Sequence, residues 1–297
     1  MSPNASNCLL GNDTMNFAIV TPSFNKARYL VRCLNSVLEQ NYSNVDYWVL
    51  DNCSTDGSKD ILDGFQKRYP QLLHVVIEPD NGQAEAINKG FSVAQGDIMG
   101  WLNADDSYLP GTFSRVESFF NQNPNVDLVY GRARILDGDF NYCGDYPVQT
   151  PNLSVLKSYD FIPQPTAFWR RRVWKGVGPL DNTLNWGLDW DFFIRAFCQY
   201  KAAFLDNYLV EVVCDGHHKT ALGGLARTRE FARIARRYGG RLNPTFLFCH
   251  YVLILHWLAA PMLRRQATAQ KTQQWLQRLE SYVMTFLYRF FRIHVMS

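Results

Sequence analysis

The sequence predicts an α/β protein with a mostly parallel, doubly wound sheet and an α-helical C-terminal extension. Short apolar runs alternate with helical patterns over the first 136 residues, an order typical of parallel sheets with helices on both faces. A hydrophobic content of 47% over 297 residues is enough for a large core and excludes an intrinsically disordered chain. After residue 218 helical patterns follow one another without strands, which predicts the extension.

Four strand and helix pairs are predicted in the first half of the chain. The first strand is expected at 17–22, and the segment after it places Leu30, Leu34 and Val37 on one helical face. Further strands are expected at 46–51, 73–78 and 97–103, followed by helical patterns at 61–69, at 83–94 and from Pro110 onward. Proline is favoured at the first position of a helix, so Pro110 is expected to begin the last of these.

The second half of the chain is less regular. A strand is expected at 127–136, a loosely patterned stretch at 140–168, a helix at 189–199 and a strand at 203–213. Helical patterns then cover 225–238, 245–260 and 272–293. We therefore expect a flexible N-terminus at 1–15, an α/β domain at 16–218 and a basic helical region at 219–297.

Small polar clusters follow four of the predicted strands: TPSFN (21–25), DNCSTDGS (51–58), EPDNGQ (78–83) and LNADD (102–106). In a parallel sheet such clusters meet at the carboxyl edge, where ligands bind. No glycine-rich phosphate loop of the GxGxxG or GxxxxGK[ST] type is present. Asp105 and Asp106 offer hard oxygen ligands that suit Mg²⁺ or Mn²⁺ bound together with a diphosphate. On these two residues alone, a cap for the helix that starts near Pro110 is the favoured interpretation.

Four blocks of the chain, in this order, resemble the family 2 glycosyltransferases, whose nucleotide-sugar-binding domain has the GT-A fold. The blocks are IVTPSFNKARYLVRCLNSVLEQNY (19–42), VLDNCSTDGSKDIL (49–62), EPDNGQAEAINKGFSVAQGDIMGWLNADD (78–106) and GLDWDFFIR (187–195). The resemblance extends from Phe17 to about Arg195. It implies an inverting transferase that uses Mn²⁺ or Mg²⁺ and moves a sugar from a nucleoside diphosphate sugar, a UDP-sugar by default, to an acceptor hydroxyl.

The resemblance also implies which residues bind the donor. They are Pro22, Ser23, Phe24, Asp51, Asn52, Asp80, Gly82, Gln83, Asn103 and Asp105. Phe24 stands where an aromatic ring stacks on the base, and the metal ligands implied are Asp105, Asp106 and His218. Asn52 and Asn103 are departures, because the family often has aspartate at both positions. A core position for Phe24 and a simple turn at 52–54 are the structural alternatives.

The catalytic base implied by the resemblance is Asp189, with Asp191 as the alternative. The base takes the proton of the acceptor hydroxyl while the diphosphate leaves from the opposite face of the sugar. An aspartate near a helix N-terminus is also favourable on electrostatic grounds alone, so a helix-capping role stays open. The same comparison places Gln164, Trp169 and Arg170 on the acceptor side.

The C-terminal region carries the positive charge. Residues 1–218 hold 17 Lys and Arg against 25 Asp and Glu, a net charge of −8, whereas residues 219–297 hold 13 against two, a net charge of +11. The apolar run 246–263 could span a bilayer or lie in its interface, and 274–293 is amphipathic. A buried pair of soluble helices is the alternative. Seven scattered cysteines favour a reducing compartment.

Together these features predict a protein held at the cytoplasmic face of a membrane, where anionic lipid attracts basic segments. The expected acceptor is a glycan or lipid-linked saccharide, and the apolar stripes favour lipid over nucleic acid as the partner. Two rival hypotheses remain. A sugar-nucleotide synthesising transferase is disfavoured because no glycine-rich loop follows the first strand. A non-catalytic, membrane-bound sugar-binding or scaffold homologue is supported by Asn52 and Asn103 only.

Overall fold

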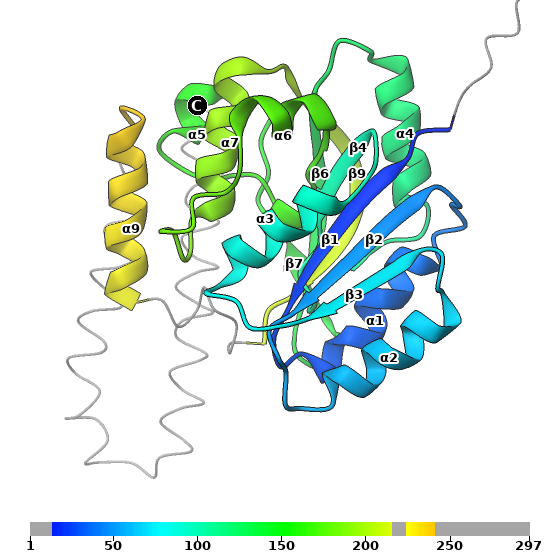
Figure 1. Ribbon diagram of the computed structural model, residues 1–297. Coiled ribbons are helices and arrows are strands. Elements are labelled where there is room, and N and C mark those ends of the chain that lie inside the picture. Colours follow the sequence, from blue (N-terminus) through cyan, green and yellow to red (C-terminus); the bar gives the residue numbers. More distant parts are fainter. Residues whose placement is uncertain (1–13, 216–223, 241–297) are drawn as a thin grey trace, which may run out of the picture.

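The computed structural model describes residues 14–215 and 224–240 (Figure 1). Most of the N-terminal segment 1–15, His218 and the helical patterns predicted at 245–260 and 272–293 lie outside the described residues. The strands are β1 Phe17–Ser23, β2 Val45–Asp51, β3 Leu73–Ile77, β4 Ile98–Trp101, β5 Ser107–Tyr108, β6 Leu128–Leu136, β7 Tyr142–Asp145, β8 Phe168–Arg170 and β9 Ala202–Val213. The helices are α1 Ala27–Leu38, α2 Ser58–Arg68, α3 Gln83–Val93, α4 Thr112–Gln122, α5 Leu153–Leu156, η1 Gln164–Thr166, α6 Arg171–Val177, α7 Leu188–Gln199 and α9 Gly224–Arg237.

The described strands form one mixed sheet in the order β3-β2-β1-β4-β8-β6-β9-β5, with β7 added to β6. The first four strands are parallel to one another, and β6 is parallel to β9. Only the short strands β5, β7 and β8 pair in the antiparallel sense. The prediction of a mostly parallel sheet is therefore confirmed, and the order of elements predicted from 17 to 136 is confirmed with it.

Helices cover both faces of the sheet because successive residues of a buried strand point to opposite sides. Ala18 and Val20 of β1 belong to a core that contains residues of α3, α7 and α9. Phe17 and Ile19 belong to a second core with residues of α1 and α4. This alternation along one strand is the doubly wound arrangement expected from the sequence.

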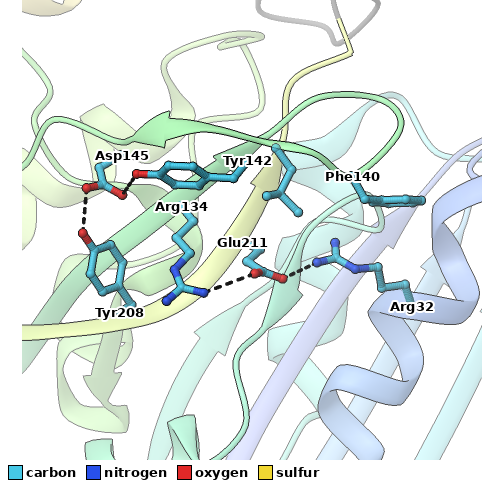
Figure 2. Close-up of a pocket in the computed structure, with 8 residues that line it drawn as sticks. Arg32, Arg134, Phe140, Tyr142, Asp145, Tyr208 and Glu211 are labelled. Carbon is cyan, nitrogen blue, oxygen red and sulfur yellow. Dashed lines mark hydrogen bonds and ion pairs between the residues drawn. The ribbon is translucent and has the colours of Figure 1, made fainter.

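Two local features differ from the sequence-based expectation. The helix α4 begins at Thr112 and not at Pro110, because Gly111 takes a left-handed conformation with φ of +76° just before it. The stretch 140–168 contains β7, α5 and η1, and β8 and α6 follow. These elements were not predicted because each is too short to show a period. The strand β7 pairs with β6, and the turn between them brings Phe140 next to Arg32 of α1 (Figure 2).

The helix α9 packs with the α/β domain although it follows the boundary predicted after residue 218. Ile234 and Ala235 are buried in the same core as Leu188 and Trp190 of α7. The rings of Trp190 and Phe231 meet edge to face, with centroids 5.4 Å apart. The α/β domain therefore continues through α9. Within the described residues, no helix has the length and apolar character needed to cross a membrane.

Candidate active site

Asp51, at the end of β2, ties the loop after β1 to the loop after β2. Its carboxylate accepts hydrogen bonds from Ser23 Oγ at 2.8 Å, from Ser54 N at 2.8 Å and from Ser54 Oγ at 2.7 Å. Ser23 and Asp51 are both buried, and a buried carboxylate needs donors of this kind. Pro22 lies beside Leu50 in the β1–β2 register. These contacts fix the positions of the loops after β1 and β2 relative to each other.

Phe24 and Asn52 are the accessible residues of the same edge. The side chain of Phe24 is 56% exposed, which excludes the core position considered from the sequence. Asn52 Oδ1 accepts a hydrogen bond from Asp80 N at 3.0 Å, and Asp80 Oδ1 accepts one from Gly82 N at 2.8 Å. Among the described residues, the Nδ2 group of Asn52 has no acceptor. An open aromatic ring and an amide donor therefore lie on one edge, and Asn52 also holds the loop after β3.

Asn103, just after β4, is the centre of a polar network. Its Oδ1 accepts hydrogen bonds from Gln83 Nε2 at 2.7 Å and from Trp101 Nε1 at 2.8 Å. Its Nδ2 donates to Asp106 Oδ2 at 3.3 Å and to Gln164 Oε1 at 3.2 Å. A carboxylate could accept the first two bonds but could not donate the last two. Asparagine is therefore the residue that this network requires, and the network brings Gln83 and Gln164 to the expected site.

Asp105 and Asp106 lie next to this network with different surroundings. Asp105 is partly accessible and pairs with Lys26 Nζ at 2.7 Å. Asp106 is buried, and burial together with the charge of Asp105 raises its pKa well above the usual value. Lys26 is a site residue that the motif comparison missed. Its position directly after the TPSFN cluster is the one sequence signal that could have indicated it.

Asp105 and Asp106 place two carboxylates after β4, and carboxylate oxygens are the ligands that a hard divalent cation prefers. Among residues 14–215 and 224–240, no group of three or more His, Cys, Asp or Glu side chains is arranged to hold a metal. His218, the third ligand expected from the sequence, lies outside the described residues. Asp105 and Asp106 are thus the described carboxylates able to contribute to such a site.

Asp189 lies in the first turn of α7 and interacts electrostatically with a second acidic residue, Asp160. Asp189 is half-buried, and its Oδ1 accepts a hydrogen bond from Trp190 N at 2.8 Å. Burial and the charge of Asp189 raise the pKa of Asp160 well above the usual value. Asp160 and Asp189 also both raise the pKa of the partly buried Tyr146, after the larger effect of burial. No sequence motif contains Asp160, so only the fold shows that Asp189 has a carboxylate neighbour.

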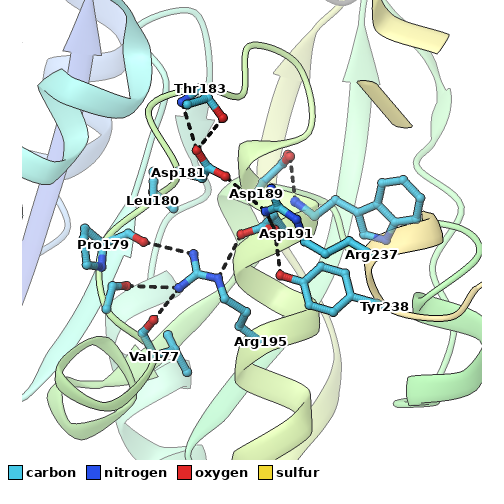
Figure 3. Close-up of polar contacts among 12 residues, drawn as sticks. Val177, Pro179, Leu180, Asp181, Thr183, Asp189, Asp191, Arg195, Arg237 and Tyr238 are labelled. Atoms are coloured by element: carbon cyan, nitrogen blue, oxygen red, sulfur yellow. Dashed lines mark hydrogen bonds and ion pairs between the residues drawn. The ribbon is translucent and has the colours of Figure 1, made fainter. Parts of the chain in front are cut away.

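Asp191 has a structural role, which corrects its assignment as the alternative base. Its side chain is 1% exposed and binds three groups: Arg195 Nε at 2.8 Å, Arg237 Nη1 at 3.0 Å and Tyr238 Oη at 2.7 Å (Figure 3). Both carboxylate oxygens are occupied by these partners. Asp191 therefore joins α7 to the end of α9 and does not face an acceptor.

Glu230 of α9 holds the segment that leads into α7. Its carboxylate accepts hydrogen bonds from three consecutive backbone N–H groups, those of Asn185 at 2.9 Å, Trp186 at 2.7 Å and Gly187 at 2.8 Å. The side chain is 6% exposed, so these bonds are shielded from water. Gly187 precedes the helix that carries Asp189. Glu230 is therefore a positioning residue for the expected base, although the sequence assigns α9 to a separate region.

Replacing Glu230 with Gln is expected to lower stability by about 1–3 kcal/mol, because a neutral amide cannot accept all three backbone bonds as a carboxylate does. We expect the turnover rate to fall further than donor affinity, since the segment before Asp189 is loosened. Denaturant unfolding and steady-state kinetics measure the two effects. Glu39→Gln, the same change at an exposed residue, serves as the control. A fall in donor affinity with unchanged turnover would contradict the positioning role.

Two of the three residues expected on the acceptor side are placed elsewhere. Trp169 is completely buried and packs against Phe91 and Phe192. Arg170 pairs with Ile98, at the amino end of β4, and its guanidinium donates to the carbonyl groups of Val126 and Phe120. Because β8 runs antiparallel to β4, each residue after Phe168 lies further from the carboxyl edge. Gln164 alone reaches the site, through Asn103.

Several known proteins are similar to this chain. A PGL/p-HBAD biosynthesis glycosyltransferase of Mycobacterium tuberculosis is 30% identical over 233 residues, which are 76% of this chain and 87% of that protein. An uncharacterized glycosyltransferase of Nostoc sp. is 29% identical over 200 residues, which are 64% of this chain and 60% of that protein. A putative teichuronic acid biosynthesis glycosyltransferase of Bacillus subtilis is 35% identical over 91 residues, 31% of this chain and 36% of that protein.

Solved structures share the fold. The crystal structure of S. aureus TarS 1–349 in complex with UDP-GlcNAc matches with a TM-score of 0.62 at 16% sequence identity, covering 89% of this chain and 79% of that one. This likeness shows the GT-A fold that the sequence predicts. The model of the family "Glycosyl transferase family 2" matches residues 18–178. With this match over more than half of its length, the chain belongs to glycosyl transferase family 2.

Proposed function

We propose that the protein transfers a sugar from a nucleoside diphosphate sugar to an acceptor hydroxyl, with inversion at the transferred carbon. The observation that carries the proposal is the continuous polar edge at the carboxyl ends of β1, β2 and β4. Ser23 is bonded to Asp51, Asn52 to Asp80, and Gln83 to Asn103, and Lys26 pairs with Asp105 at the end of that row. An edge of this kind is where open α/β sheets bind nucleotides.

Uridine diphosphate is the donor nucleotide that the accessible residues favour. Phe24 offers an open ring for stacking, and the Nδ2 group of Asn52 offers a donor for a carbonyl of a pyrimidine. S. aureus TarS, which shares the fold, has been solved in complex with UDP and with UDP-GlcNAc. Names of relatives in teichuronic acid and PGL/p-HBAD biosynthesis support a glycan or lipid-linked acceptor.

The reaction requires one group that takes a proton and another that stabilises the leaving diphosphate. In our proposal Asp189 accepts the proton of the acceptor hydroxyl as its oxygen attacks the sugar, and the diphosphate leaves from the opposite face. Glu230 and the Asp191 network hold the helix that carries Asp189. Asp105 and Asp106 would hold Mg²⁺ or Mn²⁺, which stabilises negative charge on the diphosphate when bound. Lys26 adds a fixed positive charge at the same strand end.

A donor panel without acceptor tests the proposal. The full chain is incubated with UDP-, GDP- and dTDP-sugars in Mg²⁺ or Mn²⁺, and release of the nucleoside diphosphate is measured. We expect slow hydrolysis of at least one UDP-sugar, because an active transferase site usually permits some attack by water. Absence of release from every donor, together with binding of a UDP-sugar, would favour the non-catalytic sugar-binding or scaffold homologue.

The hypothesis of a non-catalytic homologue is supported in the sequence by Asn52 and Asn103, and the contacts of both residues weaken that support. Asn103 donates to Asp106 and Gln164 and accepts from Gln83 and Trp101, so its amide is integrated into the site. Asn52 is likewise bonded to the loop after β3. Neither asparagine leaves an unfilled aspartate position, and the catalytic interpretation is therefore preferred.

We further propose that residues 241–297 attach the protein to the cytoplasmic face of a membrane, on the basis of their basic and amphipathic sequence. The full chain is expected to float with vesicles that contain anionic lipid, and added salt should weaken the attachment because it screens charge. A chain that ends at residue 240 is expected to stay in the dense fraction. Equal flotation of both chains would refute the proposal.

A further inference from the structure

A cleft of about 490 Å³ lies beside α1, where β6, β7 and β9 come together (Figure 2). This volume is within the range of about 300–1,000 Å³ that is common for ligand sites. The walls of the cleft carry two arginines, two acidic residues and three aromatic rings: Arg32, Arg134, Asp145, Glu211, Phe140, Tyr142 and Tyr208. None of the donor, metal or base residues lines it. The cleft therefore has a composition of its own that the proposed reaction does not explain.

The charges of the cleft compensate one another. Glu211 pairs with Arg32 and, at 3.7 Å, with Arg134. Asp145 accepts hydrogen bonds from Tyr142 Oη at 2.9 Å and from Tyr208 Oη at 2.6 Å. Two positive and two negative groups leave no net charge, so neither a phosphate nor a cation is favoured. Carboxylate, guanidinium and phenol groups are instead suited to exchange hydrogen bonds with the hydroxyl groups of an uncharged ligand.

The aromatic rings are exposed and held in place. Tyr142 is 60% exposed and Phe140 is 40% exposed, so both rings present accessible aromatic surface next to the charged groups of the cleft. The Arg32 guanidinium lies 5.0 Å from the centre of the Phe140 ring, and that of Arg134 lies 5.1 Å from the centre of the Tyr208 ring. The ligand would therefore meet surfaces that are already ordered.

The turn that carries Phe140 is strained. Phe140 has a φ of +65°, a left-handed conformation that bulky residues rarely adopt. Asp137 Oδ1 stabilises the turn by accepting hydrogen bonds from the N–H groups of Asp139 and Asn141, both at 2.9 Å. Strain of this kind persists where the surrounding structure enforces it and is concentrated at functional sites. In this protein the strained turn places the ring of Phe140 at the wall of the cleft.

The cleft is connected to the proposed active site by Tyr29 of α1. The Tyr29 ring packs edge to face on Phe140, with centroids 6.0 Å apart, and its Oη donates to Asp215 Oδ2 at 2.8 Å. On its other side, the Tyr29 ring has Lys26 Nζ 5.8 Å from its centre, and the same Nζ pairs with Asp105 at 2.7 Å. Tyr29 and Lys26 therefore lie between the aromatic wall of the cleft and Asp105 after β4.

We propose that this cleft is a saccharide-binding subsite that holds a neutral part of the acceptor glycan away from the reacting hydroxyl. The C–H face of a sugar ring packs on Phe140 and Tyr142, and its hydroxyl groups exchange hydrogen bonds with the charged groups of the cleft. The inference rests on the proposed function, because it assigns a place to the acceptor. It adds a second point of contact that would favour longer glycans over short ones.

Binding of oligosaccharides to the full chain tests the proposal independently of catalysis. The labelled protein is applied to an array of neutral oligosaccharides, and affinity for the best of these is measured by calorimetry. Tyr142→Ala and Phe140→Gly are each expected to weaken this affinity about tenfold, as loss of an aromatic contact commonly does. Val93→Ala, a change at another exposed apolar residue, is the control and should bind as the wild type does.

Inorganic phosphate and phosphatidylglycerol vesicles are the comparison probes. Absence of oligosaccharide binding, or binding that neither cleft variant weakens, would overturn the proposal. So would phosphate or vesicle binding that Tyr142→Ala abolishes, because the cleft would then be an anion site. UDP binding by the wild type is measured in parallel. If the wild type binds oligosaccharide but does not bind UDP, the result counts against the proposed function and not against the saccharide subsite.

Discussion

Replacing Asp105 with Ala is expected to reduce sugar transfer at least about a thousandfold, the scale of losing electrostatic stabilisation of a leaving group. Asp105 is the accessible carboxylate at the end of β4, next to Asp106 and paired with Lys26. Its removal takes away a metal ligand in the proposed site. We also expect Mn²⁺ to stop enhancing UDP binding, which calorimetry with and without the metal measures.

The protein should remain folded in this variant, because Asp105 is partly exposed and its ion pair contributes little to stability. Circular dichroism and the unfolding midpoint check this point. Asp60→Asn, which removes the charge of an exposed aspartate on α2, is the control and should retain transfer. Transfer at the wild-type rate by the Asp105 variant would exclude the proposed metal-dependent mechanism.

Replacing Asp189 with Asn is expected to lower kcat by about 10²–10⁴, the usual contribution of a general base. The amide has nearly the same shape but cannot take the proton of the acceptor hydroxyl. The proposed donor residues lie at strand ends, whereas Asp189 lies on α7. The affinity of the variant for UDP should therefore be unchanged. Steady-state kinetics with the donor identified by the panel, and UDP calorimetry, separate the two quantities.

Asp191→Asn provides the matched comparison, since the same change is made two residues further along α7. Asp191 is buried against Arg195, Arg237 and Tyr238, and breaking a buried ion pair costs about 3–5 kcal/mol. We therefore expect a lower unfolding free energy for this variant, with transfer retained by the folded fraction. The opposite pattern, a stable Asp191 variant without transfer and an active Asp189 variant, would move the base to Asp191.

Much of the fold was predictable because the relevant signals are local. The alternation of apolar runs and helical patterns indicated β1 to β4, β6, β9 and the major helices within a few residues. The polar clusters were predictable as one edge, since parallel strands bring their carboxyl ends together. Gln83 of the cluster at 78–83 binds Asn103 of the cluster at 102–106, so two of the predicted clusters do meet.

The roles of individual polar residues were less predictable, because they depend on neighbours from distant segments. Asp189 and Asp191 look alike in GLDWDFF, yet the fold brings Arg237 of α9 and Tyr238, just after that helix, to the carboxylate of Asp191. Trp169 and Arg170 follow Gln164 closely, yet the antiparallel direction of β8 carries them into the core and toward the far edge. Asp160 and Glu230 belong to no motif, and their importance comes from the residues that the fold places beside them.

The sequence by itself determined the fold class, the family and the edge of the sheet at which the site is built, because these depend on periodicity and on short blocks of contiguous residues. The tertiary structure alone decided which carboxylates are neutralised and which stay accessible, that α9 is part of the α/β domain, and that a cleft forms beside α1. The physical reason is that burial and charge pairing are properties of neighbours in space. Lys26 and Asp105 are separated by 79 positions in the chain but lie 2.7 Å apart in the site.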